Sequence, residues 1–250
     1  MTHQEKIIEV KNLSKAYKSK EGNIKALKSL SLEVRRGEII GLLGPNGAGK
    51  TTAVKLIMGF LSPTEGDIFF QGKRLNVAEP RKKIGYLPEN FRPNPNLTVY
   101  EYVKLQCDLA NDHSERSTRA TIMGLLELVG MNPWHHRRIA ALSKGMGQRV
   151  GLAQAFAGDP DCLILDEPTS GLDPIGKREI ITFLLEMKKK GKTIFFCSHI
   201  LSEVERLCDR IGILVEGELR FLGSVEEFLK KWDVNSLEDG FIREVKCSVS

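Results

Sequence analysis

Short runs of hydrophobic residues alternate with stretches of helical periodicity along much of the chain. Residues 30–34 read Leu-Ser-Leu-Glu-Val, an alternation that predicts a half-buried strand, and residues 38–43 form an apolar strand that leads into a glycine-rich loop. Later buried strands are expected at 162–165 and 193–197, and helices at 174–190 and 200–207. This succession of strands and helices predicts an α/β fold with a mainly parallel core sheet.

The middle of the chain, at about residues 95–157, has a different pattern with few β-branched runs. Val99 and Val103 recur at roughly helical spacing, and so do Ile122 and Leu126. We therefore expect a helical subdomain that is inserted into the α/β core.

The C-terminal part of the chain is expected to close the domain. Residues 210–221 predict an antiparallel hairpin with a turn at Glu216-Gly217. The tail at 233–250 is polar, and its pattern does not determine an element. A length of 250 residues suits one large domain with an insert, which we place at residues 5–232.

Composition narrows the class of protein. With 41% hydrophobic and 28% charged residues, the chain is neither disordered nor collagen-like. The five cysteines form no CxxC pair and are expected to be reduced packing residues. No apolar run approaches the roughly 18–20 residues that cross a bilayer, and no secretory signal is evident, so we expect a soluble, cytoplasmic chain. The net charge is +5 but aromatic residues make up only 7%, which favours surface lysines over a nucleic-acid groove, and no nucleic-acid partner is expected.

Residues 44–51, Gly-Pro-Asn-Gly-Ala-Gly-Lys-Thr, match the pattern GxxxxGK[ST] in full. The alternative interpretation of these residues is a simple glycine-rich turn. The motif follows a predicted strand and begins a predicted helix, and this context favours a phosphate loop. Glycines let backbone N–H groups face phosphate oxygens, and the helix dipole favours an anion. We expect Lys50 to reach the β- and γ-phosphates and the Thr51 hydroxyl to ligate Mg²⁺. The expected nucleotide-binding residues are Gly44, Pro45, Asn46, Gly47, Ala48, Gly49, Lys50, Thr51 and Thr52.

Residues 163–167, Leu-Ile-Leu-Asp-Glu, end an apolar run with two carboxylates. A strand of a parallel sheet places such residues at its carboxyl end, where ligands bind. We expect Asp166 to hold Mg²⁺, directly or through water, and Glu167 to polarise the attacking water. Many strands end in acidic turns, so the pair is informative only beside the phosphate loop. The chain contains no Asn-Lys-x-Asp element of the kind that reads guanine, which favours ATP over GTP.

Residues 142–149, Leu-Ser-Lys-Gly-Met-Gly-Gln-Arg, lie between these two motifs and resemble the signature segment of the ATP-binding cassette (ABC) ATPases. Together with Ser170-Gly171-Leu172-Asp173 and Ser198-His199, the order of motifs is similar to this family over residues 7–228. The resemblance implies a P-loop NTPase fold with a mainly parallel core sheet, an antiparallel β subdomain and an inserted α-helical subdomain. It also implies ATP and Mg²⁺ as cofactors and ATP hydrolysis as the activity.

The resemblance assigns roles to five further residues. Tyr17 resembles the aromatic residue that stacks on adenine, and His199 the histidine that contacts the γ-phosphate. Ser143 and Gly145 resemble the signature residues that contact a γ-phosphate bound to a second subunit. Asp173 resembles the aspartate that reaches across to that subunit. From its residue type alone, Ser143 is also expected to cap a helix.

Two segments depart from the family pattern. The consensus Leu-Ser-Gly-Gly-Gln is here Leu-Ser-Lys-Gly-Met. Glu89 stands where the family has a glutamine that contacts Mg²⁺ and water; a carboxylate can also ligate Mg²⁺, but it adds charge beside the phosphates. These variants, and the ending at residues 236–241, resemble ATPase subunits of exporters whose membrane domain is a separate chain.

Three functions are therefore compared. The first is an ATPase subunit that drives a separate integral-membrane permease, in the export direction, from the inner face of the cell membrane. In this hypothesis ATP is held between the phosphate loop of one subunit and the signature segment of another, in a homodimer or a heterodimer of homologous subunits. The second is a soluble ABC ATPase that acts on nucleic acid or ribosomes, a class that usually carries two cassettes or long coiled-coil inserts. The third, a non-catalytic interaction protein, would have lost Lys50 or Glu167, and both are present.

Overall fold

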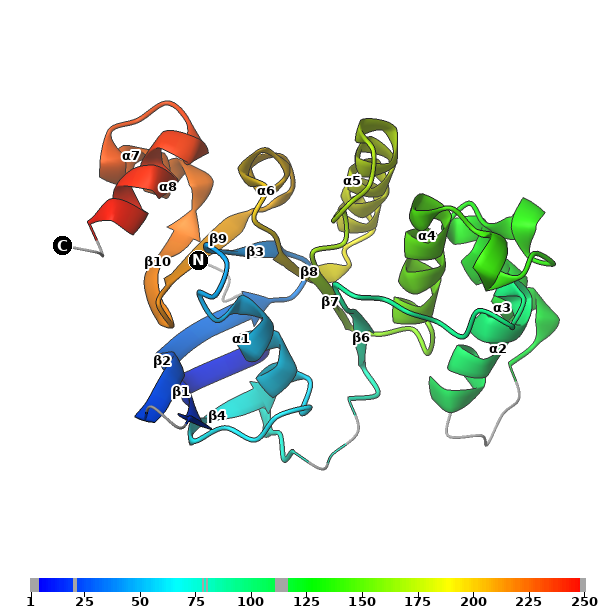
Figure 1. The fold of residues 1–250 in the computed structure, drawn as a ribbon, viewed down its shortest axis with the longest axis horizontal. Helices are drawn as coiled ribbons and strands as arrows, with labels where there is room; N and C mark the ends of the chain where they lie inside the picture. The colour runs from blue at the N-terminus through cyan, green and yellow to red at the C-terminus, as the bar shows by residue number, and fades with distance from the viewer. Residues whose placement is uncertain (1–4, 20–21, 78, 80, 111–116, 248–250) are drawn as a thin grey trace. The chain divides into compact units, whose positions relative to one another are not determined.

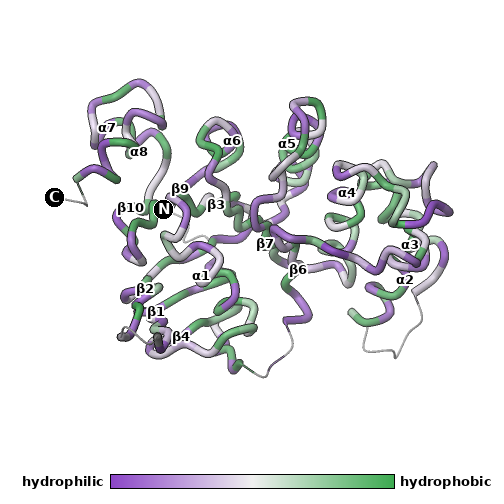
Figure 2. The backbone as a smooth tube through the Cα atoms, viewed as in Figure 1, coloured by the Kyte–Doolittle hydropathy of each residue, from purple (hydrophilic) through white to green (hydrophobic). Residues whose placement is uncertain are grey.

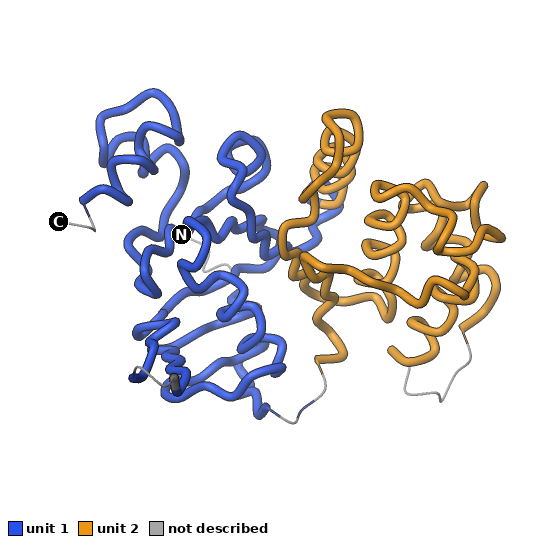
Figure 3. The backbone as a smooth tube through the Cα atoms, in the orientation of Figure 1, with its two compact units in different colours: residues 1–80, 188–250 blue, residues 81–187 orange. Residues whose placement is uncertain are grey.

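The computed structural model describes residues 5–19, 22–77, 79, 81–110 and 117–247 (Figure 1). The chain divides into two compact units (Figure 3). Unit 1 comprises residues 1–80 and 188–250, and unit 2 comprises residues 81–187. The two units are described separately below.

The core of unit 1 is built on β3 (Ile39–Leu43), a strand in which every residue is buried. This strand pairs in parallel with β8 (Thr193–Cys197) and with β9 (Arg210–Val215), and β9 pairs antiparallel with β10 (Glu218–Ser224). Figure 2 shows the hydrophobic stretches along these strands. Uninterrupted apolar strands are typical of a sheet that is covered on both faces. The predicted parallel strands and the closing hairpin are confirmed.

A second sheet of unit 1 is antiparallel throughout, with the order β2-β1-β4-β5. Its strands are β1 (Lys6–Ser19), β2 (Gly22–Arg35), β4 (Glu65–Phe70) and β5 (Lys73–Arg74). Strand β2 extends well beyond the strand predicted at residues 30–34, and β1 pairs along its length. Their distal halves are rich in lysine and serine, so pairing across the hairpin, rather than burial, extends them. The pairing includes several register shifts.

The described part of unit 1 also contains the helices α1 (Lys50–Ile57), α6 (Leu201–Leu207), α7 (Val225–Trp232) and α8 (Leu237–Lys246). The polar tail, whose structure the sequence left open, contains α8. Leu237 is fully buried, and Glu244 is 6% exposed. The Oε2 atom of Glu244 accepts hydrogen bonds from Trp232 Nε1 at 2.8 Å and from Lys231 Nζ at 2.6 Å. These contacts tie α8 to α7.

Unit 2 contains a parallel pair of strands, β6 (Ile84–Leu87) and β7 (Cys162–Asp166). Its helices are α2 (Val99–Ala110), α3 (Arg119–Leu128), α4 (Lys144–Ala155) and α5 (Pro174–Lys189), with short 3-10 turns η1 (Asn132–Trp134) and η2 (Ile139–Ala141). Glycines allow α4 to pack closely on β6, because a Cβ on Gly151 would come within 2.6 Å of Leu87 Cδ1. In the part of the chain that the structure describes, no helix is long and apolar enough to cross a membrane.

The cysteines are free thiols, and four of the five are packed in the interior. Cys107, Cys162, Cys197 and Cys208 are buried, in agreement with the packing role predicted for them, whereas Cys247 is exposed. Burial raises the pKa of Cys107 to about 11 and also raises that of Cys208. These buried thiols are therefore protonated at neutral pH and poor nucleophiles.

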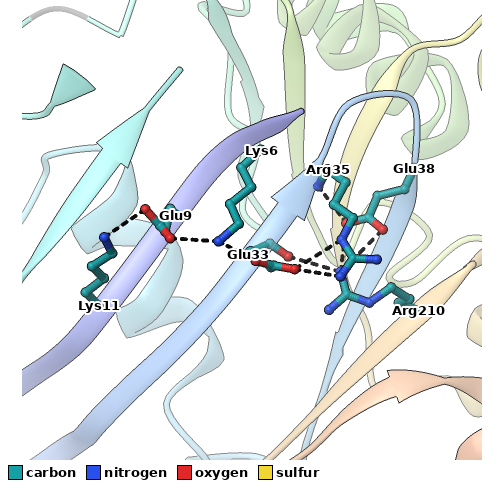
Figure 4. A network of polar contacts seen from close by, with 7 residues as sticks. All are labelled: Lys6, Glu9, Lys11, Glu33, Arg35, Glu38 and Arg210. Carbon is teal, nitrogen blue, oxygen red and sulfur yellow. Dashed lines mark hydrogen bonds and ion pairs between the residues drawn. The ribbon is translucent and has the colours of Figure 1, made fainter. Parts of the chain in front are cut away.

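A chain of ion pairs lies at the start of β3 (Figure 4). Glu38 precedes β3 directly and is 5% exposed; its Oε1 accepts hydrogen bonds from the Arg35 backbone N–H at 2.7 Å and from Arg210 Nη1 at 3.2 Å. Desolvation raises the pKa of Glu38, and the hydrogen bonds and Arg210 oppose this effect. The network joins β1, β2 and β9, and its members are Lys6, Glu9, Lys11, Glu33, Arg35, Glu38 and Arg210.

Candidate functional site

The phosphate loop connects the end of β3 to the first turn of α1 in unit 1. A Cβ on Gly44 would overlap the carbonyl oxygen of Leu214, and one on Gly49 would come within 2.5 Å of the carbonyl oxygen of Ala26. Gly47 has a φ of +81°, a conformation that glycine adopts without a steric penalty. The geometry of the loop itself therefore requires all three glycines.

Lys50 is the first residue of α1 and is only 8% exposed. Its Nζ donates hydrogen bonds to the carbonyl oxygens of Gly44, at 2.6 Å, and of Pro45, at 3.2 Å. The first turn of α1 contains no acidic residue, so its positive potential is not cancelled locally. Thr51 and Thr52 follow in the same turn and are half-buried. An inward-facing cation at a helix N-terminus suits an anion with several oxygens, such as a polyphosphate.

His199 lies at the same edge of the sheet as the phosphate loop. Strands β3 and β8 are parallel, with Leu42 opposite Cys197, so the residues that follow them emerge at one edge. Ser198 is fully buried, and its Oγ accepts a hydrogen bond from the backbone N–H of Ile200 at 3.0 Å. This turn leaves His199 exposed. Unit 1 therefore carries a histidine and the phosphate loop on neighbouring strands.

Tyr17 lies near the turn end of the β1–β2 hairpin of unit 1, two residues before the Ser19–Gly22 pair, and is 38% exposed. Its strand partner is Ile24, which is 60% exposed. The Nζ of Lys15 stands 5.5 Å from the centre of the Tyr17 ring. An accessible aromatic ring beside an apolar side chain can stack on a planar base.

Asp166 is the last residue of the buried strand β7 in unit 2, and Glu167 follows it directly; they are 1% and 6% exposed. The backbone of Glu167 has a φ of +51°, in the left-handed region. A non-glycine residue there costs of the order of 1–3 kcal/mol, and such strain concentrates at functional sites. Here the strained backbone belongs to Glu167, the residue whose carboxylate the sequence predicts to polarise the attacking water.

Glu89 lies at the same edge of unit 2 as these two carboxylates. Strands β6 and β7 are parallel with Leu87 opposite Leu165, so Glu89 and Asp166 both follow the carboxyl ends of neighbouring strands. The three acidic residues that the sequence assigned to metal and water therefore follow neighbouring strands at one edge of this strand pair.

The signature segment forms the start of α4. Ser143 is the N-cap, as its residue type predicted, and its Oγ accepts a hydrogen bond from the backbone N–H of Met146 at 3.3 Å. A Cβ on Gly145 would meet only Leu172 Cδ2, at 3.9 Å, and one on Gly147 would meet nothing within 4 Å. Glycine inside a helix costs about 1 kcal/mol relative to alanine, and packing within the described residues gives no reason for either glycine.

Asp173 caps the next helix of unit 2. Its Oδ1 accepts a hydrogen bond from the backbone N–H of Gly176 at 2.7 Å, at the start of α5. This hydrogen bond fixes the loop that follows Asp166 and Glu167. It uses one acceptor position of the Asp173 carboxylate and leaves the others available.

A cavity of about 340 Å³ lies in unit 2 between the segment after β6 and the start of α4. The residues that line it include Glu89, Arg92, Ser143, Lys144, Gln148 and Ser170. Glu89 and Ser143 were predicted from the sequence, whereas no role was predicted for Lys144 or Gln148. In the sequence, the only indication that Lys144 is unusual is that it replaces the glycine of the family consensus.

Each unit offers oxygen donors of the kind that Mg²⁺ accepts. Thr51 in unit 1 carries a hydroxyl, and Asp166 and Glu89 in unit 2 carry carboxylates. Mg²⁺ takes oxygen ligands and is usually bound through one or two carboxylates together with substrate phosphates. Among residues 5–19, 22–77, 79, 81–110 and 117–247, no group of three or more His, Cys, Asp or Glu side chains could hold a metal alone.

The sequence of the chain matches a known family and several known proteins. Residues 27–170 match the family described as ABC transporter. The chain is 41% identical to an uncharacterized ABC transporter ATP-binding protein of Synechocystis sp. over 231 residues. The aligned region covers 90% of this chain and 65% of the length of that relative. It is 38% identical over 213 residues to a lantibiotic transport ATP-binding protein of Streptococcus pyogenes, over 85% of this chain and 89% of that protein.

A solved structure has the same fold. It is a dimeric ATP-binding cassette in a post-hydrolysis state, bound to ADP and Pi. It aligns with a TM-score of 0.78 and 28% identity, over 88% of this chain and 99% of that chain. The α/β P-loop NTPase fold predicted from the sequence is thereby confirmed.

Proposed function

Because the chain belongs to the ABC transporter family of ATPases, we propose that it hydrolyses ATP to drive export through a permease formed by a separate chain. The similarity to a lantibiotic transport ATP-binding protein supports a transport role. It favours a membrane permease over nucleic acid or ribosomes as the partner. In this proposal the permease holds the subunit at the inner face of the cell membrane.

The phosphate loop carries the chemistry of the proposal. Lys50 binds the β- and γ-phosphates in exchange for its two carbonyl partners, and His199 contacts the γ-phosphate from the neighbouring strand. Glu167 accepts a hydrogen bond from the attacking water and so polarises and orients it. Thr51 and Asp166 would hold Mg²⁺, which would supply charge neutralisation at the phosphates.

Tyr17 and Glu89 have supporting roles in the proposal. Tyr17 stacks on the adenine through its exposed ring. Glu89 is an additional Mg²⁺ ligand, because a carboxylate is a ligand that Mg²⁺ accepts.

The signature segment acts on the nucleotide of a second subunit. The unexplained glycines at 145 and 147 leave the start of α4 open to close approach by another molecule. Ser143 and Gly145 then contact the γ-phosphate of the second subunit, and Asp173 reaches across to it. The second subunit is another copy of this chain or a homologue. ATP holds the two subunits together, hydrolysis releases them, and the permease converts these two states into alternating access.

The experiment that tests the partner is affinity purification of the tagged chain from detergent-solubilised membranes of its own cell. We expect a multi-span permease, identified by mass spectrometry, in a complex that hydrolyses ATP. The Glu167→Gln chain should keep the permease and lose turnover, while the exposed control Glu186→Gln keeps both. Recovery of ribosomal proteins or RNA without a permease would contradict the proposal.

A further inference from the structure

Lys144 occupies an electrostatically unfavourable position. It is the first residue of α4, directly after the N-cap Ser143. A helix N-terminus carries a positive partial charge, so a cation there is destabilising. The first turn of α4 contains no acidic residue that could offset this cost. A glycine, as in the family pattern, would avoid it.

The Lys144 side chain is also held at a specific place. Its ammonium group lies over Gly171, where a side chain on residue 171 would overlap it. Gly171 has a φ of +66° and lies in the loop between Glu167 and Asp173. In the part of the chain that the structure describes, Lys144 forms no ion pair. The cation therefore stands between the signature segment and the loop after the carboxylates without a counter-charge.

The cavity beside Lys144 contains a second unsatisfied group. Gln148 is 7% exposed and lines this cavity, and its side chain forms no hydrogen bond to any described residue. Its amide is accessible from the cavity, so it can form a hydrogen bond to a ligand bound there. Lys144 and Arg92 bring two positive charges to the cavity against the single carboxylate of Glu89. Two cations, a helix N-terminus and a free amide together favour a ligand with several anionic oxygens.

We propose that Lys144 is a further phosphate-binding residue, which contacts the terminal phosphate of the nucleotide held by the second subunit. This inference rests on the proposed two-subunit site, where it adds a charged ligand to Ser143 and Gly145. An ammonium group binds phosphate oxygens as a point charge. The same chemistry could recognise free inorganic phosphate, so the experiment separates the two sources.

The test measures ATP-dependent dimerisation by size exclusion with light scattering, in a Glu167→Gln background that retains ATP. Lys144→Met should raise the protein concentration for half-dimerisation about a hundredfold, because the symmetric dimer loses one charge-assisted hydrogen bond, worth about tenfold, at each of its two sites. Lys144→Arg should stay within about twofold of the parent, because it retains the cation. Lys190→Met removes the same charge at an exposed position and should match the parent.

Thermal unfolding of the monomer distinguishes this role from a structural one. Lys144→Met should leave the melting temperature unchanged or raise it, because it removes a cation from a helix N-terminus. A lower melting temperature together with weaker dimerisation would indicate a structural role and overturn the proposal.

Two further outcomes are informative. If the parent dimerises with ATP and Lys144→Met dimerises equally well, Lys144 does not bind the nucleotide phosphate, although the two-subunit site stands. If the parent fails to dimerise, the two-subunit site is wrong and this inference falls with it. Inorganic phosphate should not stabilise the nucleotide-free chain in a Lys144-dependent manner. Such stabilisation with unchanged dimerisation would assign the cavity to free phosphate and contradict the inference.

Discussion

The Nζ atom of Lys50 donates a hydrogen bond of 2.6 Å to the carbonyl oxygen of Gly44, the residue that directly follows β3. This bond joins the two ends of the phosphate loop and directs the cation into it. The ammonium group is thus already in place for phosphate oxygens. Little side-chain entropy remains to be lost when they bind, which is the benefit of preorganisation.

Replacement of this cation tests the phosphate loop. Lys50→Ala should abolish tight ATP binding and all turnover, because the loop then lacks the charge that neutralises the β- and γ-phosphates. Titration with a fluorescent ATP analogue and a phosphate-release assay measure the two effects. Lys55→Ala, at an exposed position of the same helix, is the matched control and should behave as the unmodified chain. Near-normal hydrolysis by Lys50→Ala would exclude the loop as the ATP site.

Glu167→Gln should separate nucleotide binding from hydrolysis. The amide keeps the size of the side chain but cannot accept a proton, so turnover should fall about 10²–10⁴-fold while ATP and Mg²⁺ still bind. Equilibrium titration and single-turnover assays measure the two quantities. The exposed Glu186→Gln serves as the control. A parallel loss of affinity and turnover would mean that Glu167 is not the catalytic carboxylate.

Glu89→Gln should change the metal dependence of hydrolysis. If the carboxylate ligates Mg²⁺, its removal shifts the Mg²⁺ concentration for half-maximal activity upward, because an amide oxygen is a weaker ligand for a hard cation. Affinity for ATP measured in chelator should change little. Superimposable Mg²⁺ titrations for the two proteins would exclude Glu89 as a ligand.

The ion-pair network of unit 1 predicts a pH dependence of stability. Hydrogen bonding to Lys6 first, and to Arg35, holds the pKa of Glu33 at about 2, below its usual 4.5. A lowered pKa means that the ionised carboxylate stabilises the fold above pH 4.5, and that this contribution is lost as the pH falls from 4.5 toward 2. After allowance for solvent screening, we expect about 1 kcal/mol.

Urea unfolding at several pH values measures this contribution. Between pH 4.5 and 2, the free energy of unfolding of Glu33→Gln should fall less steeply than that of the unmodified chain. The control Glu186→Gln should follow the unmodified chain. Equal slopes for all three proteins would show that Glu33 is not stabilised by its partners.

The sequence predicted the parts of the fold that local pattern determines. The apolar runs at β3, β7 and β8 predicted buried parallel strands, because continuous hydrophobicity requires cover on both faces. Helix α8 was missed, because its stability comes from tertiary contacts. It contains Gly240, which lies against Phe228, and Glu244, whose partners are on α7. Neither contact produces a hydrophobic periodicity in the sequence of the tail from which a helix could be predicted.

The same distinction applies to the site. Motif spacing gave the phosphate loop and the carboxylates, because each motif lies within one strand–loop segment. The position of Lys144 over Gly171 depends on how α4 and the following loop fold against each other, and no periodicity reports it. The strained backbone of Glu167 is likewise visible only in three dimensions.

The most direct test of the two-subunit site mixes two inactive variants, Lys50→Ala and Ser143→Arg. In a mixed dimer, one composite site carries both substitutions and the other carries neither. Dimers of one unmodified and one Glu167→Gln chain first establish that a single intact site hydrolyses ATP. The account predicts that mixing restores part of the ATPase activity that each variant lacks alone. No recovery, although mixed dimers form and the control dimers hydrolyse ATP, would contradict the action of Ser143 on the nucleotide of a second subunit.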